Sequence, residues 1–341
     1  MDLKVAVVIL NWNGIHYLET FLPVVLKYTD KPGQKIFVVD NNSTDGSVDF
    51  VKNSFPEVGI ICFEENHGFA RGYARALPQI QTEYYVLLNS DVEVTENWLD
   101  PLVRLMDDEC DTAAAMPKIL SYSNKDHFEY AGAAGGFIDK YGYPFCQGRI
   151  LTEIEKDTGQ YDTTREIFWA SGACMFLRSS AYYKAGGLDG DFFAHMEEID
   201  LCWRLKRLGF RIIYFPGSSV FHVGGGTLPN DNPRKLYYNY RNSLFMLIKN
   251  LSFANYFSVF FPRLFLDLIS ALLYLIQGKL TFFMAVFRAH IRFYISLPGL
   301  INKRRIFNKF ISRNKVSLIY PGSIVFQFFV RKRKVFTDLG F

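Results

Sequence analysis

A short apolar run near the start of the chain recurs at intervals. Residues 5–10 read Val-Ala-Val-Val-Ile-Leu, and comparable runs occupy residues 36–39, 59–63 and 84–88. Continuous apolar runs rich in β-branched residues are typical of strands buried on both faces of a parallel sheet. Segments with helical spacing of apolar residues separate them. The pattern therefore predicts repeated strand–helix–strand units, and hence an α/β chain with a Rossmann-like, mostly parallel sheet.

The regular alternation fades after about residue 115. Residues 119–165 are rich in Gly, Tyr and Asp, which predicts long substrate-facing loops with a hairpin near residues 135–148. Strand and helix patterns return further along. We expect a catalytic domain over residues 1–250, with a nucleotide-binding half over 1–115 and an acceptor half over 116–250.

The composition changes again in residues 251–341. Tyr256 to Ile276 and Leu280 to Leu300 are almost wholly apolar, and each is near the ~20 residues of a bilayer span. Each also carries interior charge, which favours helices lying in the membrane interface over clean spans. A re-entrant hairpin and a soluble helical cap are the alternatives. Basic clusters interleaved with Phe and Ile follow, so we expect a helical, membrane-associated extension that meets anionic lipid.

The bulk composition limits the partners and the compartment. Lys and Arg outnumber Asp and Glu by only 38 to 34, so nothing points to nucleic acid as a partner. The five cysteines are widely spaced, with no C-x-x-C pair, as in a reducing compartment. The first residues lack the pattern of a secretory signal. We expect a cytoplasmic protein, peripheral on the inner face of the plasma membrane.

Polar residues follow the ends of the expected parallel strands, where ligands bind in sheets of this kind. Neither G-x-G-x-x-G nor a phosphate loop is present, so a nucleotide must be held in another way. The strand-end residues outside the acidic motif described next are Asn11, Asn13, Asp40, Asn41, Asn66 and Gly68.

A possible metal site follows the fourth strand. Asn89-x-Asp91-x-Glu93 offers oxygen ligands on alternate residues, expected to point to one side. Such an array suits Mg²⁺ or Mn²⁺, which would hold the two phosphates of a nucleotide sugar. His222, at a strand end before a glycine-rich loop, is placed to complete this shell. The alternatives are a helix-capping turn and a structural histidine.

A third acidic cluster opens a predicted helix at Glu197, Glu198 and Asp200. The helix dipole favours negative charge there. Asp200 and Arg204 stand four residues apart and are expected to pair, which leaves Glu197 and Glu198 to project into the cleft. A carboxylate there can take the proton from an acceptor hydroxyl as it attacks a sugar. The choice between the two glutamates stays open.

Seven segments, in this order, resemble the inverting glycosyltransferases of family two, and in particular bacterial rhamnosyltransferase-like members that build surface polysaccharides. The resemblance covers about residues 3–250 and implies the A-type glycosyltransferase fold. The segments are VAVVILNWNG, VVDNNSTDGS, ENHGFARG, LLNSDVEV, GACMFLRSS, GGLDGDFFAHMEEIDLCWRLKRLG and VFHVGGGT.

The resemblance also implies roles for single residues. Asn11 and Trp12 would line the base pocket and Asp40 would bind a pyrimidine ring, with Asn89 and Ser90 also beside the donor. Asp91 matches the second acid of the D-x-D motif. Glu93 matches a further acid beside that motif, and Glu198 matches the family's base. His222 matches a histidine that ligates the metal in some members. Three residues depart from the pattern: Asn89 replaces the first Asp of D-x-D, Tyr73 stands in place of Asn, and Glu198 stands in place of Asp.

These observations predict transfer of a sugar, with inversion, from a nucleotide diphosphate sugar to an acceptor hydroxyl. The resemblance implies a dTDP- or UDP-sugar donor, and the membrane-facing extension suggests a lipid-linked saccharide acceptor. A sugar nucleotidyltransferase is one alternative. It needs a glycine-rich loop with Lys or Arg after the first strand, and residues 11–14 contain neither Lys nor Arg. A non-catalytic, membrane-bound carbohydrate-binding scaffold is another, and the intact carboxylates argue against it.

Overall fold

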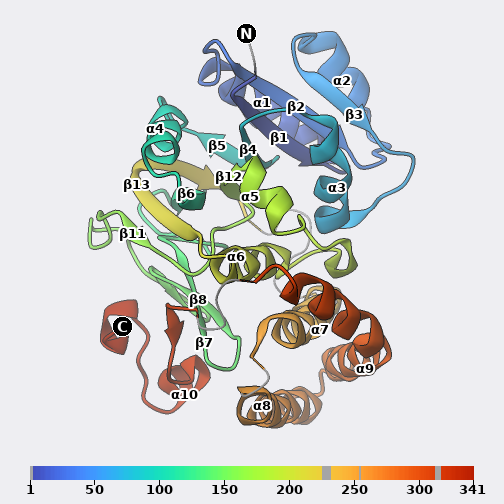
Figure 1. The fold of residues 1–341 in the computed structure, drawn as a ribbon, viewed down its shortest axis with the longest axis vertical. Coiled ribbons are helices and arrows are strands. Elements are labelled where there is room, and N and C mark those ends of the chain that lie inside the picture. Colours follow the sequence, from blue (N-terminus) through green and yellow to red (C-terminus); the bar gives the residue numbers. More distant parts are fainter. Residues whose placement is uncertain (1–2, 225–231, 253–254, 312–315) are drawn as a thin grey trace.

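The computed structural model describes residues 3–224, 232–252, 255–311 and 316–341. Four parallel strands form the first half of the main sheet, in the order β4-β1-β2-β3 (Figure 1). Residues 5–9 expose at most 2% of their surface, as the apolar runs predict. The strands and the helices that link them are β1 (Val5–Asn11), α1 (Ile15–Lys27), β2 (Gln34–Asp40), α2 (Ser47–Ser54), β3 (Gly59–Cys62), α3 (Gly68–Ala76) and β4 (Tyr84–Asn89).

The same sheet continues on the other side of β4 as a mixed sheet, in the order β11-β13-β6-β12-β4. Strand β12 runs antiparallel to both neighbours, and β13 runs parallel to β6. The predicted α/β fold with a Rossmann-like sheet is therefore confirmed, parallel in its first half and mixed in its second. The elements of this half are β5 (Val92–Val94), α4 (Asp100–Asp108), β6 (Thr112–Ser121), β11 (Arg165–Glu166), β12 (Cys174–Arg178), α5 (Ser179–Lys184), α6 (Glu197–Arg207) and β13 (Arg211–His222).

A second, smaller sheet is formed by the middle loops and the end of the chain, in the order β10-β9-β8-β7-β14. The hairpin expected near residues 135–148 is the antiparallel pair β7–β8. The rings of Phe336 and Phe341 pack within 5.4 Å of Phe137, between ring centroids, so the end of the described chain packs against the hairpin β7–β8 (Figure 1). The strands are β7 (Gly136–Asp139), β8 (Pro144–Cys146), β9 (Arg149–Ile150), β10 (Glu153–Ile154) and β14 (Ile319–Tyr320).

Helices complete the end of the molecule opposite β1 to β3. The extension expected over 251–341 contains two long helices, α8 and α9, and further along β14 pairs with β7 before the short helix α10. Two of its helices are long and apolar enough to cross a membrane, by length and composition only. The helices of this end are α7 (Pro233–Asn250), α8 (Tyr256–Ile276), α9 (Leu280–Asn308) and α10 (Ile324–Phe329).

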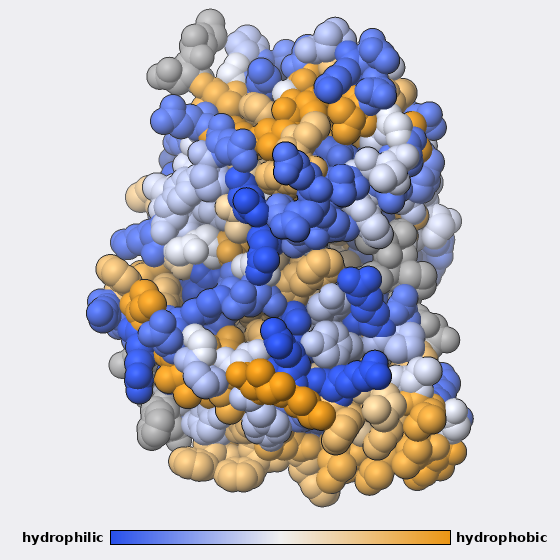
Figure 2. Space-filling model, turned by 90° about the vertical axis from the view of Figure 1, so that its right-hand side faces the viewer, coloured by the Kyte–Doolittle hydropathy of each residue, from blue (hydrophilic) through white to orange (hydrophobic). Residues whose placement is uncertain are grey.

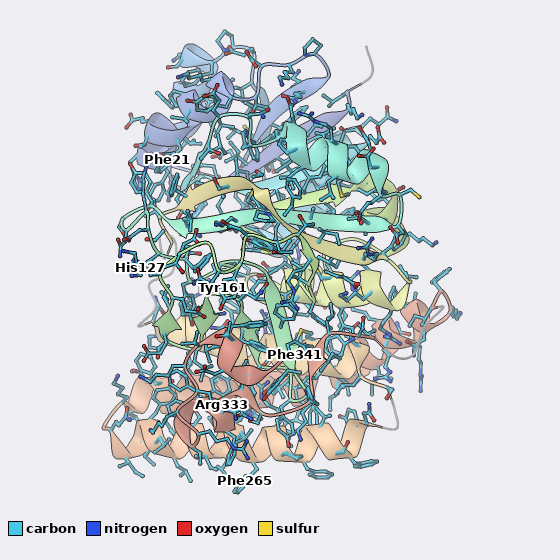
Figure 3. The ribbon with its side chains drawn as sticks, turned by 90° about the vertical axis from the view of Figure 1, so that its left-hand side faces the viewer. Phe21, His127, Tyr161, Phe265, Arg333 and Phe341 are labelled. Carbon is cyan, nitrogen blue, oxygen red and sulfur yellow. The ribbon has the colours of Figure 1, made fainter. Side chains whose placement is uncertain are left out.

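The interior charges of α8 face α7 and the turn between β7 and β8. Nε of Arg263 donates to Oδ1 of Asp267 at 2.8 Å, and both side chains are buried. The hydroxyl of Tyr143 donates to the same carboxylate at 3.0 Å. On the outer face, Phe265 points away from the molecule and is 63% exposed (Figure 3). The charged residues therefore dock α8 and leave an apolar surface at this end of the molecule (Figure 2).

Candidate active site

The carboxyl ends of β1, β2 and β4 bring the first predicted site residues side by side. Asn11 lies opposite Asp40 in the β1–β2 register, and Leu10 lies opposite Asn89 in the β1–β4 register. Nδ2 of Asn11 donates to Oδ1 of Asp40 at 3.2 Å, and the Ser43 backbone N–H donates to Oδ2 of Asp40 at 2.8 Å. Oδ1 of Asn11 is buried and has no hydrogen-bond partner among the described residues. This edge therefore retains one buried acceptor that a ligand could satisfy.

Trp12 and Ser90 flank this edge. Trp12 is 46% exposed immediately after β1. Gly14 lies two residues further along, and a Cβ added there would lie 3.6 Å from the Ser90 hydroxyl oxygen and 2.6 Å from Oδ1 of Asn11. The backbone between β1 and α1 therefore comes close to both β4 and Asn11, and a side chain larger than hydrogen would fill this space.

Hydrogen bonds from the side chain of Asn41 connect the loop after β2 to Asn66, in the loop after β3, and to Gly68, where α3 begins. Nδ2 of Asn41 donates to Oδ1 of Asn66 at 3.0 Å and to the Gly68 carbonyl at 3.1 Å, while Oδ1 of Asn41 accepts from the His67 backbone N–H at 2.9 Å. Gly68 has φ +71°, and a Cβ there would lie 2.5 Å from the Phe193 ring. Since the amide of Asn41 is fully engaged within the protein, these residues shape the loop and join α3 to the segment before α6.

Tyr73 lies in the core. Its hydroxyl donates to the Val8 and Leu88 carbonyls at 3.1 and 3.2 Å, between β1 and β4. This tyrosine, which departs from the family pattern, packs within the sheet and takes no place on the ligand side.

Asp91 and His222 meet at the centre of the site. Nε2 of His222 lies 3.1 Å from Oδ1 of Asp91 and 3.3 Å from Nδ2 of Asn89, and Nδ1 lies 3.2 Å from Oε2 of Glu129. All but Asn89 are buried. Burial alone would lower the pKa of His222, but the carboxylates of Glu129 and Asp91 raise it to about 10. Burial likewise tends to raise the pKa of Asp91, and its bond to His222 brings it below the ordinary value. An imidazolium held between two carboxylates results.

Glu93 does not join this cluster. Strand β5 pairs with β13 so that Val92 lies opposite His222 and Glu93 opposite Phe221. Oε1 of Glu93 accepts from Nζ of Lys125 at 2.7 Å. The alternation expected from Asn89 through Asp91 to Glu93 fails because a turn separates β4 from β5 and resets which side each residue faces. Within the described ranges, no three His, Cys, Asp or Glu side chains converge as a metal site made of protein ligands alone would require.

The segment before α6 is strained, and the side-chain amide of Asn242 is one of the groups that hold it. Phe193, His195 and Met196 have φ between 65° and 71°, a conformation that residues other than glycine rarely adopt. Nδ2 of Asn242, on α7, lies 2.7 to 2.9 Å from the carbonyl oxygens of Phe192, Ala194 and His195. Asn242 therefore fixes the backbone from which Glu197 and Glu198 project.

Of the three acids at the start of α6, only Asp200 is paired within the protein, as the sequence predicted. It lies 2.8 Å from Arg204 and 2.7 Å from Lys249. Oε2 of Glu197 and Oε2 of Glu198 are buried without a hydrogen-bond partner in the part of the chain that the structure describes. Burial raises the pKa of Glu198 to about 7, and burial together with the charge of Glu198 raises that of Glu197 well above its ordinary value. A carboxyl group poised near neutrality suits proton transfer.

Shared neighbours join the two acidic clusters. Burial, and then the charges of Glu129 and Glu198, raise the pKa of the buried Cys146 thiol against the opposing effect of Arg149. Burial lowers the pKa of Lys235, on α7, against the opposing effect of Glu129, and burial followed by the charge of Lys235 lowers the pKa of His195. A cavity of about 300 Å³ lies on the Glu129 side. Its lining includes Ser121, His127, Glu129, Tyr130, Gly224 and Lys235.

Glu129 and Lys235 were not expected as site residues. Glu129 belongs to an irregular stretch between β6 and β7 with no hydrophobic period, and nothing in its spacing links it to His222. Lys235 lies in the first turn of α7, and a lysine at such a position is expected from sequence alone to be an ordinary solvent-exposed residue. Only the tertiary fold brings either residue to the site.

Comparisons with known proteins agree with this geometry. The family described as glycosyl transferase family 2 matches residues 6–186. N-acetylglucosaminyl-diphospho-decaprenol L-rhamnosyltransferase of Mycobacterium tuberculosis is 25% identical over 238 residues, which cover 63% of this chain and 75% of that protein. Rhamnosyltransferase WbbL of Escherichia coli is 24% identical over 165 residues, covering 48% of this chain and 61% of that protein.

Solved structures share the fold at low sequence identity. GalNAc-T7 with UDP, GalNAc and Mn²⁺ superposes with a TM-score of 0.58 and 16% identity, over 73% of this chain and 48% of that one. Mannosyltransferase PcManGT of Pyrobaculum calidifontis, in complex with GDP-Man and Mn²⁺, gives 0.52 and 13% over 91% of this chain and 84% of that one. This chain thus spans about half of the first structure and most of the second. The chain belongs to glycosyl transferase family 2 and is a glycosyltransferase with the A-type fold, similar to rhamnosyltransferases.

Proposed function

We propose that this glycosyltransferase moves a sugar from a nucleoside diphosphate sugar to an acceptor hydroxyl, with inversion at the anomeric carbon. One observation carries the proposal. Asp91 is engaged by His222, whereas Glu197 and Glu198 keep buried carboxylate oxygens without partners in the described chain. The two sets of residues suit different tasks. Asp91 and His222 can hold the leaving diphosphate through a cation, and a glutamate at the start of α6 can accept a proton.

The donor side is assigned to the edge formed by Asn11, Trp12, Asp40 and Ser90. An exposed indole beside a buried amide and a carboxylate suits stacking and hydrogen bonding of a nucleobase. Two solved structures of similar fold were determined with UDP and with GDP-Man. A dTDP- or UDP-sugar is the proposed donor, as the family resemblance implies for this chain.

A divalent cation fits at Asp91 and His222 if it displaces the proton from Nε2 of His222, because only the neutral ring offers a lone pair to a metal. Mg²⁺ or Mn²⁺ commonly takes one or two protein ligands and completes its shell with substrate phosphates and water, so a pair of ligands suffices. Ligating histidines usually bind a carboxylate through their other nitrogen, and Glu129 lies 3.2 Å from Nδ1 of His222. When bound, the cation would stabilise the negative charge that develops on the departing diphosphate. Glu93 is not proposed as a direct ligand because it pairs with Lys125.

Glu198 is the proposed base. The acceptor oxygen forms its bond to the anomeric carbon as the bond from that carbon to the diphosphate oxygen breaks, and the hydroxyl proton passes to Glu198. One displacement inverts the configuration and needs no covalent enzyme intermediate. Glu197 is more deeply buried than Glu198, and its pKa lies well above the ordinary value. Glu197 therefore stays protonated at pH values at which Glu198 can lose its proton.

The acceptor is proposed to be a lipid-linked saccharide at the inner face of the plasma membrane. The outer face of α8 exposes Phe257, Phe261 and Phe265 by more than 60% each. Exposed apolar surface of this extent marks an interaction site, and basic residues on α9 and in 331–334 suit anionic lipid. The mycobacterial relative is named for an acceptor in which a diphosphate links the sugar to decaprenol.

The proposal is tested with the purified protein, a panel of dTDP-, UDP- and GDP-sugars, and Mg²⁺ or Mn²⁺. We expect one nucleoside diphosphate to raise the melting temperature in the presence of metal, because a ligand that binds only the native state stabilises it. The matching nucleotide sugar should then be consumed with transfer to a lipid-linked acceptor. A product that retains the donor's anomeric configuration would contradict the single displacement.

A further inference from the structure

A second cavity, of about 390 Å³, opens between the loop after β3, the turn before α6, and the helices α7 and α9. None of Asp91, Glu198 and His222 lines it. The lining residues that bear on its chemistry are Glu65, Arg71, Asp191, Arg241, Arg292 and Ser296. It therefore joins the donor half of the protein to a helix of the apolar end.

Arg241 supplies a fixed positive charge. Its side chain is 8% exposed, and its guanidinium donates to Oδ1 of Asn242 at 2.8 Å and to the carbonyls of Asp191 and Phe192 at 2.9 and 2.7 Å. No carboxylate of the described residues lies within ion-pair distance of it. A buried charge held only by neutral oxygens and aromatic rings is costly unless a counter-ion completes its surroundings.

The other charges leave the cavity positive. Asp191 lies 3.7 Å from Arg71 but also 2.6 Å from Lys303, and Glu65 lies 3.2 Å from His67. Lys303 offsets Asp191, and the three arginines of the lining outnumber its two acidic residues. Arg292 is exposed on α9 and forms no ion pair within the described part of the chain. Guanidinium groups present parallel donors that match phosphate oxygens, so the excess charge suits a phosphate or diphosphate.

An apolar stripe of α9 runs beside the cavity. Arg292 and Ser296 line the cavity, while Phe287, Ile291 and Ile295 recur every four residues and are exposed. Neighbouring residues of a helix are separated by about 100° around its axis, so the polar and apolar stripes adjoin. The helix α9 that carries this stripe lies beside α8 at the same end of the molecule (Figure 1). A ligand with an anionic head and a hydrocarbon chain matches both surfaces at once.

We propose that this cavity binds the diphosphate of the lipid-linked acceptor, with its hydrocarbon chain along the stripe formed by Phe287, Ile291 and Ile295. The proposal rests on the proposed function and names where the acceptor's head group is held. Bulk anionic lipid and the donor diphosphate offer similar chemistry, so the experiment must separate three sources.

Vesicle binding of the full-length protein separates them. One set of phosphatidylcholine vesicles carries undecaprenyl diphosphate, and a second carries phosphatidylglycerol to the same total charge. The wild-type protein should bind the first set more tightly. Arg292→Glu should remove that preference, with roughly tenfold or greater weakening, as expected for a lost charge-assisted hydrogen bond. Arg305→Glu is the matched control, because Arg305 is also exposed on α9 but does not line the cavity.

Any one of three results would overturn the proposal. Equal losses of affinity for both vesicle types would indicate a general lipid surface, and unchanged vesicle binding by Arg292→Glu would show that the cavity holds no head group. Weaker binding of UDP or dTDP by this variant would indicate a donor site. Thermal unfolding verifies the fold of each variant, and Arg71→Ala, at an exposed position, gives a second test of the same cavity. Because the assay involves binding without transfer, its failure is distinguishable from failure of the proposed reaction.

Discussion

Oδ1 of Asp91 and Nε2 of His222 lie 3.1 Å apart, although 131 positions separate the two residues in the sequence. The pairing of β5 with β13 explains this approach, since it brings the turn after β4 against the last residue of β13. Glu129 closes the other side of the imidazole. The three residues form a chain of alternating charge at the edge of the sheet where a nucleotide diphosphate is proposed to bind.

Glu129→Gln should weaken cation binding without removing a proposed ligand. The amide cannot stabilise the imidazole as the carboxylate does, and loss of such an outer partner typically costs about 10–100-fold in metal affinity. Titration calorimetry of Mn²⁺ in the presence of UDP measures this effect. Glu153→Gln, at a half-exposed position whose ion pair with Lys334 lies outside the site, is the control, and equal affinities in both variants would contradict the role of Glu129.

Gly68→Ala should destabilise the protein more than Gly186→Ala. Both glycines have positive φ, but a Cβ at Gly68 would lie 2.5 Å from the Phe193 ring, whereas nothing lies within 4 Å of one at Gly186. Strain in the left-handed region costs about 1 kcal/mol or more in both variants, and the clash adds to it only at Gly68. Urea unfolding gives both values. Equal losses would mean that α3 and the segment before α6 are not in close contact.

The state of Glu198 gives stability a pH dependence of known sign. Burial raises its pKa from 4.5 to about 7 in the folded protein, so the folded state binds more protons than the unfolded state between these values. The free energy of unfolding should therefore fall as pH rises from about 4.5 to 7, by this group's contribution. Denaturant unfolding at several pH values should show this slope reduced in Glu198→Gln, and an identical slope in both proteins would contradict the raised pKa.

Opposite faces of α8 should respond differently to substitution. Asp267→Ala leaves Arg263 buried without its partner, which typically costs about 3–5 kcal/mol of stability. Phe265→Ser changes an exposed residue, so it should leave the melting temperature almost unchanged but weaken flotation with vesicles. The two measurements together test whether one face docks the helix and the other meets lipid. A loss of stability in Phe265→Ser without a loss of vesicle binding would reverse this assignment.

The sequence predicted the features that depend on local pattern. The buried strands, the β7–β8 hairpin and the Asp200–Arg204 pair follow from hydrophobic period, turn residues and helical spacing, and the structure confirms them. The side to which Glu93 points was not predictable, because a turn between two short strands interrupts the alternation. The contact of Glu129 with His222 depends on how an irregular loop folds, and no local rule specifies it.

The end of the chain illustrates the same limit. β14 is two residues long, and its pairing with β7 is set by the packing of Phe336 and Phe341 on the second sheet. A Phe-rich and basic stretch has the composition of a membrane surface. Burial of particular rings against a distant hairpin is a tertiary effect that composition cannot reveal.

The roles of Glu197 and Glu198 give the most direct test. Each is changed to Gln, and the transfer rate and the affinity for the nucleoside diphosphate are measured in the same preparations. Glu198→Gln should lose about 10²–10⁴-fold in rate, as expected for removal of a positioned base, while nucleotide affinity stays unchanged. Normal turnover by Glu198→Gln together with loss of activity in Glu197→Gln would contradict the account.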